Sequence, residues 1–142
     1  MKKTIFLGLI ISLIISCTTQ ERKSSIEGAW QLVYGKWTGL KGTFPGQIPG
    51  SDIKMWSKEH FTFVGQFKLD TALLDNYGGG TYTLDGNRYQ ENVIYHANKP
   101  SIGSKPKMLL EIRNDSLIQK YPTNENWELV GEYSIEIYKR LK

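Results

Sequence analysis

The chain has 142 residues, with 18 Lys and Arg against 14 Asp and Glu, and a net charge of +4. Its basic residues form no concentrated basic face, which argues against a nucleic-acid partner, because phosphate recognition requires one. One cysteine excludes an internal disulfide, and two histidines without a Cys or His neighbour at ligand spacing predict neither a metal nor a cofactor.

The first residues have the pattern of an export signal. Lys2 and Lys3 precede an almost wholly apolar run over residues 4–15. This run is too short to span a bilayer with margin, so it indicates a secretory signal peptide. The alternative to a lipoprotein signal is a plain signal peptide or a single anchor helix, with a chance cysteine at position 17.

The end of the apolar run, Ile14-Ile15-Ser16-Cys17, resembles the lipobox of bacterial lipoproteins, in which a small residue precedes the modified cysteine. The resemblance implies cleavage before Cys17 and lipidation of that cysteine with a diacylglycerol and an N-acyl chain such as palmitate. More than one acyl chain gives durable anchoring. We therefore expect a cell-envelope protein, held by lipid on the periplasmic or surface side of a bacterial membrane.

These features divide the chain into three parts. We expect a signal peptide over residues 1–16, a lipidated cysteine with a flexible polar tether over 17–25, and a folded domain over 26–142. Removal of the signal peptide leaves 126 residues and, without Lys2 and Lys3, a charge of +2. That length suits one domain and not two.

The domain is predicted to be all-β. Short alternating runs, 14 Gly and many aromatic residues favour strands over helices. In chain order the expected strands cover 28–34, 53–55, 60–67, 78–84, 88–96, 107–113, 117–121, 127–130 and 133–141. A long loop is expected over 36–50, a second loop over 98–105, and a short helix or plain loop over 68–77.

Turn residues predict how these strands connect. Asp85-Gly86-Asn87 is the clearest hairpin, since Asp-Gly tolerates the positive φ of a tight turn, and Asn114-Asp115-Ser116 marks a second one. Gly78-Gly79-Gly80 predicts a bend or a close backbone approach. Sequential antiparallel strands of this number predict an up-and-down β-barrel of about eight strands, because closure removes unpaired edges. An open sandwich is the alternative.

Gly28 and Trp30 in the first strand and Arg140 in the last resemble the lipocalin and calycin arrangement, in which the Arg closes the barrel floor over the Trp. A guanidinium over an indole is a favourable cation–π contact. Longer stretches at 28–33, 60–64, 78–95 and 136–140 resemble small bacterial lipocalin-like lipoproteins, a group whose domain has no known function. The loop over 36–50 and the region 121–127 match that group less well. The resemblance implies a fold, and ligand binding only by analogy.

Side-chain alternation predicts the interior faces of two strands. In 88–96 it places Tyr89, Glu91 and Tyr95 inside and His96 outside. In the last strand, an inward Arg140 places Tyr138 and Glu136 inside as well.

Two interior carboxylates predict a polar-lined pocket, because a buried charge is costly unless it is paired, hydrogen-bonded or hydrated. The alternative is that Glu136 simply pairs with Arg140 or another basic residue near the barrel floor. The orientation of the strand that begins at His60 stays open, as does whether Trp37, Phe44 and Trp56 line the mouth of the barrel or cap its core. The candidate ligand-binding residues are His60, Tyr82, Tyr89, Glu91, Tyr95, Glu136 and Tyr138.

We expect a monomeric, non-enzymatic protein that holds a small, partly apolar ligand inside the barrel. One alternative is a barrel filled by its own side chains that acts on an envelope component through its loops. Another is an enzyme that uses Glu91, Glu136 or His60 as acid or base.

Overall fold

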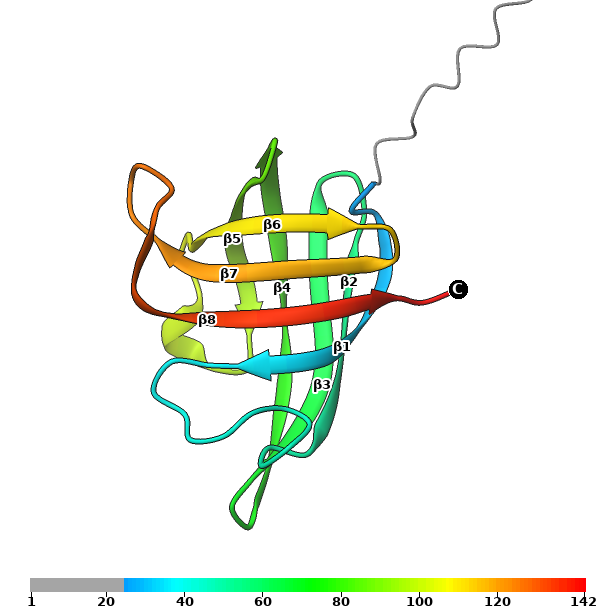
Figure 1. Ribbon diagram of the computed structural model, residues 1–142, viewed down its shortest axis with the longest axis vertical. Helices are drawn as coiled ribbons and strands as arrows, with labels where there is room; N and C mark the ends of the chain where they lie inside the picture. Colours follow the sequence, from blue (N-terminus) through cyan, green and yellow to red (C-terminus); the bar gives the residue numbers. More distant parts are fainter. Residues whose placement is uncertain (1–24) are drawn as a thin grey trace, which may run out of the picture.

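Residues 25–142 are described by a computed structural model, in which eight antiparallel strands close into a barrel in sequential order (Figure 1). The strands are β1 (Gly28–Lys36), β2 (Gly50–Trp56), β3 (His60–Leu69), β4 (Ala72–Asp85), β5 (Arg88–His96), β6 (Lys107–Arg113), β7 (Ser116–Thr123) and β8 (Leu129–Arg140). A short 3-10 helix, η1 (Lys99–Ser101), follows β5. The prediction of an all-β up-and-down barrel is confirmed, and the open sandwich is wrong because β1 pairs with β8.

The predicted signal peptide, Cys17 and nearly all of the predicted tether lie outside the described residues. Within residues 25–142, no helix is long and apolar enough to cross a membrane.

The largest departure from the expected strands lies in the segment 68–77, for which a short helix or loop was the expectation. Here β3 and β4 stay paired as far as Leu69 and Ala72, and only Asp70 and Thr71 form the turn. Asp70 takes a positive φ of 53°, which Asp tolerates better than most residues. Adjacent apolar residues Leu73 and Leu74 interrupt the alternation, so the sequence pattern conceals this strand.

The floor of the barrel is closed by contacts between its first and last strands. The guanidinium carbon of Arg140 lies 4.1 Å from the centre of the Trp30 ring. Trp30 is fully buried and donates its indole N–H to the carbonyl of Ile26 at 2.8 Å. Gly28 has a φ of +119°, and a Cβ there would lie 3.0 Å from Nη1 of Arg140, so a larger residue would disturb this closure.

The interior next to this floor is filled by aromatic and aliphatic side chains. Trp56 packs edge-to-face on Tyr89 and Tyr138, with ring centroids 6.4 and 6.2 Å apart. Leu117 is fully buried beside them. We call this the floor half of the barrel.

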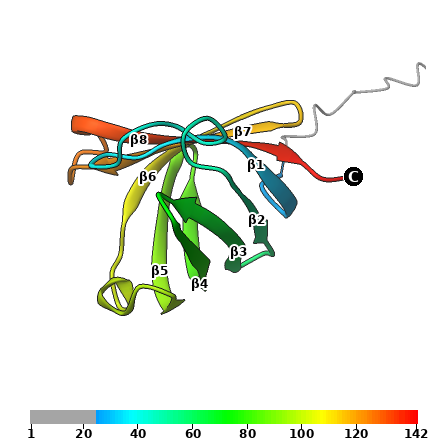
Figure 2. The ribbon, with the colours of Figure 1, turned by 90° about the horizontal axis from the view of Figure 1, so that it is seen from below.

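The opposite end is built differently and is here called the mouth half. It is bordered by the β1–β2 loop (37–49), the β3–β4 turn and the segment 98–106. Only three residue pairs join β5 to β6. Beyond them, the backbone N–H groups of Glu91 and Val93 donate to carbonyls of Pro106 and Ser104 instead. Figure 2 shows β5 and β6 diverging toward this end.

Candidate functional site

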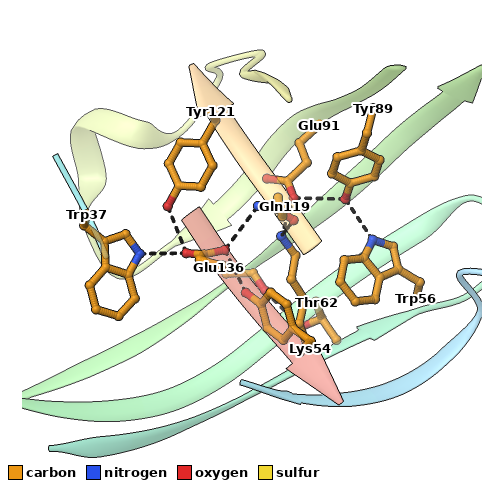
Figure 3. Close-up of polar contacts among 11 residues, drawn as sticks. Trp37, Lys54, Trp56, Thr62, Tyr89, Glu91, Gln119, Tyr121 and Glu136 are labelled. Carbon is orange, nitrogen blue, oxygen red and sulfur yellow. Dashed lines mark hydrogen bonds and ion pairs between the residues drawn. The ribbon is translucent and has the colours of Figure 1, made fainter. Parts of the chain in front are cut away.

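A cavity of about 680 Å³ lies in the mouth half of the barrel. Its apolar lining includes Phe63 and Phe67 of β3 and Leu74 of β4, together with Ile48 of the β1–β2 loop. Its polar lining comes from β2, β5, β7 and β8, whose inward side chains form a connected hydrogen-bond network (Figure 3). The cavity therefore has an apolar wall and a polar wall.

Glu136 of β8 is the centre of the polar wall. Its Oε1 accepts hydrogen bonds from the indole N–H of Trp37 at 2.7 Å and from the hydroxyl of Tyr121 at 2.8 Å. Its Oε2 accepts from the hydroxyl of Tyr138 at 2.8 Å and from Nε2 of Gln119 at 3.2 Å. All four donors are neutral, so hydrogen bonds satisfy this carboxylate without cancelling its charge.

Lys54 of β2 and Glu91 of β5 form a buried ion pair, with Nζ and Oε1 2.6 Å apart. Glu91 also accepts from the hydroxyl of Tyr89 at 2.9 Å, and that hydroxyl accepts from the indole N–H of Trp56 at 2.8 Å. The Lys54 ammonium lies 5.1 Å from the centre of the Trp56 ring, a cation–π distance. The pair is thus compensated in charge, and Oε1 of Glu91 accepts from both Lys54 and Tyr89.

Gln119 of β7 joins the two glutamates. Its Oε1 accepts from Nζ of Lys54 at 3.3 Å, while its Nε2 donates to Glu136. An ammonium can only donate, so this contact determines which end of the amide faces each partner. The network therefore runs continuously from the floor half to the mouth half (Figure 3).

Asp52 of β2 lacks such compensation. The residue is 3% exposed, and its Oδ1 accepts one hydrogen bond, from Nδ2 of Asn76 at 2.9 Å. Among the described residues, no donor contacts Oδ2. Burial raises the pKa of Asp52 from 3.8 to about 6, and the negative charge of Glu136 adds to the rise, against the opposing effects of Asn76 and Lys54.

The cavity as a whole is acidic, although the chain is basic. Its lining contains the four carboxyl groups of Asp52, Asp75, Glu91 and Glu136 but only one ammonium, that of Lys54. Burial lowers the pKa of His96, which also lines the cavity, so this imidazole is neutral at neutral pH. Burial and the nearby carboxylates raise the pKa of Tyr121 and Tyr138 well above the ordinary value, so both hydroxyls stay protonated donors.

Four of the seven candidate ligand-binding residues belong to this network: Tyr89, Glu91, Glu136 and Tyr138. Three of these, Glu91, Glu136 and Tyr138, line the cavity. The alternative in which Glu136 pairs with Arg140 is wrong, since Arg140 instead donates to the carbonyls of Glu27 and Ser25.

The predicted orientations of Tyr95 and His96 are wrong. The β4–β5 register shifts between Gly79, which pairs with Tyr95, and Gly80, which pairs with Val93, so Ile94 is an extra residue. This bulge reverses the alternation beyond it. Tyr95 is consequently 70% exposed, and His96 turns inward with its ring centre 5.5 Å from that of Phe63.

The glycine run makes this bulge possible. A Cβ at Gly80 would lie 2.0 Å from the carbonyl oxygen of Asn92, so the strands approach each other only because no side chain is there. The close backbone approach predicted for the three glycines is therefore present.

His60 and Tyr82 lie away from the cavity. Phe61 points inward from β3, which leaves His60 exposed. Tyr82 donates its hydroxyl to the carbonyl of Ser57 at 2.7 Å and lines a separate hollow of about 530 Å³ near the floor.

Trp37, Phe44 and Trp56, whose positions the sequence left open, lie in different parts of the barrel. Trp37 lines the cavity, and Phe44 packs under the β1–β2 loop with its ring centre 5.7 Å from that of Phe67. Trp56 belongs to the floor half.

Asp52, Lys54 and Gln119 also belong to the site and were not predicted from the sequence. A signal for two of them was present, because residues 52, 54 and 56 share one face of a strand and Trp56 is a natural core residue. The expected strand began at Ile53, and so it left Asp52 out.

Within residues 25–142, no three His, Cys, Asp or Glu side chains are grouped to hold a metal ion. No protein-family model matches the chain, and no curated protein is significantly similar to it. The protein is an eight-stranded antiparallel barrel of lipocalin-like fold, with an acidic cavity at one end.

Proposed function

We propose that the chain is a lipid-anchored binding protein of the bacterial cell envelope, whose barrel holds a small, partly apolar ligand. The observation that carries this proposal is the cavity of about 680 Å³ in the mouth half. Pockets of about 300–1,000 Å³ that combine an apolar lining with a few convergent polar groups are typical small-molecule sites.

Attachment by lipid is supported by the sequence that ends at Cys17, with its basic start, short apolar run and small residue before the cysteine. The closed barrel is consistent with the lipocalin-like lipoproteins that the sequence resembles, and we propose that the chain is one of them. In this arrangement the lipid is the membrane attachment and the barrel is the binding module.

The cavity favours binding over the two alternatives. A barrel that acts only through its loops would be filled by its own side chains, as the floor half is. An enzyme that uses Glu91, Glu136 or His60 is not supported, because Glu91 is ion-paired with Lys54, both oxygens of Glu136 accept hydrogen bonds and His60 lies outside the cavity.

Native mass spectrometry of the full chain, purified in detergent from its own cell envelope, tests the proposal. We expect a chain that begins at Cys17, carries acyl chains and retains a reproducible small molecule. A repeated mass of the protein alone, under gentle conditions, would contradict ligand binding. A chain without acyl mass would contradict the anchor.

A cavity-filling variant provides the control. Val93 is buried and lines the cavity, so Val93→Trp places an indole in the ligand space. We expect this variant to keep the acyl mass and lose the small molecule. A β-sheet circular dichroism spectrum like that of the unsubstituted chain would show that the barrel is retained.

A further inference from the structure

The charges that line the mouth-half cavity do not balance. The ammonium of Lys54 is 2.6 Å from Glu91, and this pair is internally neutral. Glu136 is held by four neutral donors and has no basic side chain within ion-pair distance among the described residues. Asp52 accepts from a neutral amide. Two buried carboxyl groups therefore face the cavity without a cation of their own.

These two groups act on the same part of the cavity. Asp52 is on β2 and Glu136 on β8, and β1 lies between these strands. Both side chains line the cavity. The charge of Glu136 contributes to the raised pKa of Asp52, as expected for like charges across a shared space.

The carboxyl groups of Asp52 and Glu136 differ in their hydrogen-bond partners, and this difference indicates where a ligand would bind. Both oxygens of Glu136 accept hydrogen bonds, whereas Oδ2 of Asp52 and Oε2 of Glu91 have no donor among the described residues. Glu91 is ion-paired with Lys54, and Asp52 forms no ion pair within residues 25–142. Among the described residues, the one fully buried side-chain oxygen or nitrogen without a partner is Oγ1 of Thr123, so Oδ2 of Asp52 keeps access to the cavity space. Asp52 thus offers an open acceptor, and Glu136 adds negative potential beside it.

We propose that the ligand is a small organic cation, an alkyl- or arylammonium, whose charged group binds Oδ2 of Asp52 in the field of Glu136. Its apolar part lies along the neighbouring β3–β4 hairpin, against Phe63, Phe67, Leu69 and Leu74. This inference rests on the proposed function, since it names the class of ligand for the same cavity. An anionic ligand of equal size would meet the two carboxyl groups and no free basic side chain.

Three probes of similar shape and different charge test the inference: 2-phenylethylamine, 2-phenylethanol and 3-phenylpropionate. Binding to the full chain in lipid nanodiscs would be measured by isothermal titration at pH 7.5, with empty nanodiscs as the blank. We expect the amine to bind roughly tenfold or more tightly than the alcohol, and the carboxylate to bind weakest.

Asp52→Asn supplies the specific variant, because it keeps the shape and removes the charge. It should reduce the affinity for the amine roughly tenfold and leave the affinity for the alcohol nearly unchanged. Asp70→Asn is the matched control, since Asp70 lies at the β3–β4 turn and Asn also tolerates its positive φ. This control should bind all three probes as the unsubstituted chain does.

Equal binding of amine and alcohol would overturn the inference and leave the proposed function standing. Tighter binding of the carboxylate, or no binding of any probe, would also overturn it. Loss of the proposed function is a separate result, because it would appear as the absence of any co-purified small molecule in the mass measurement. If Asp52→Asn does not fold, the ranking of the three probes on the unsubstituted chain still decides.

Discussion

The floor half and the mouth half of the barrel both bury aromatic and polar side chains, but they differ in packing and in the partners of their polar groups. At the floor, Arg140 lies over Trp30, and Trp56, Tyr89 and Leu117 belong to one buried hydrophobic cluster. At the mouth, the same sheet encloses about 680 Å³, and one oxygen of Asp52 faces that space without a donor. From this difference we expect the floor half to contribute more to the stability of the barrel than the mouth half, where burying Asp52 beside a cavity has an energetic cost.

Lys54 connects the two halves, and its removal should have the largest effect. Lys54→Met leaves Glu91 buried without its cation, which should lower the free energy of unfolding by about 3–5 kcal/mol. Urea denaturation measures this change. Lys139→Met is the matched control, because Lys139 forms an exposed pair with Asp115 and its loss should leave stability nearly unchanged. Equal effects of the two substitutions would contradict the account of the buried pair.

Truncation of an apolar side chain should have the next largest effect, and it should cost more unfolding free energy in the floor half than in the mouth half. Leu117 is fully buried within the floor half, so Leu117→Ala should lower the free energy of unfolding by about 2–5 kcal/mol. Leu74 is 44% exposed at the mouth, and Leu74→Ala should cost less than about 1 kcal/mol. Chemical denaturation of both variants checks the difference. A similar cost at the two sites would mean that the mouth half is as well packed as the floor.

Asp52→Asn should make the protein more stable at pH 8. The pKa of Asp52 is raised in the folded state from 3.8 to about 6, so its protonated form favours folding below pH 3.8 and that contribution is lost as the pH rises through 6. Removing the charge should therefore recover about 1–3 kcal/mol at pH 8 and almost nothing at pH 3.5.

Urea denaturation of the Asp52→Asn variant and of the unsubstituted chain at the two pH values measures this effect. A loss of stability at pH 8 would show that the ionised carboxyl is well accommodated, and would remove the reason to assign it to a ligand.

The affinity for the amine should also depend on the titration of Asp52, and this is the smallest of the expected effects. An ammonium requires ionised Asp52, so its affinity should rise roughly tenfold between pH 5 and pH 7. The other groups that face Asp52 are Lys54 on its own strand, Glu136 and Tyr138 on β8, and Asn76 on β4. His96, elsewhere in the cavity lining, would gain a repelling charge on acidification and act in the same direction.

Isothermal titration of 2-phenylethylamine across this pH range tests the dependence. In the Asp52→Asn variant, the affinity for the amine should depend little on pH. A pH dependence that persists unchanged in the variant would assign the titration to another group, with His96 the first to examine.

The floor half was largely predictable from the sequence, and the mouth half was not. The Gly28, Trp30 and Arg140 pattern and the Asp85-Gly86 turn are local signals, and they indicated a closed barrel with its floor in the right place. The inward positions of Glu91 and Glu136 followed from alternation within single strands.

The rest depended on features that alternation does not reveal. The bulge at Ile94 exchanged the orientations of Tyr95 and His96, and it arises from contact between two strands at Gly80. Asp52 acquires its unusual setting from Asn76, in a segment whose strand pattern is interrupted by adjacent leucines. A carboxyl group's missing donor is a property of the assembled interior, and no sequence motif marks it.

The pKa of Asp52, measured by carbon-13 NMR of the side-chain carboxyl groups in the free and the amine-saturated protein, tests the central claim most directly. We predict a value of about 6 in the free protein and a clear decrease when 2-phenylethylamine saturates the cavity. A value near the ordinary 3.8 in the free protein, or a raised value that the amine does not change, would contradict the account.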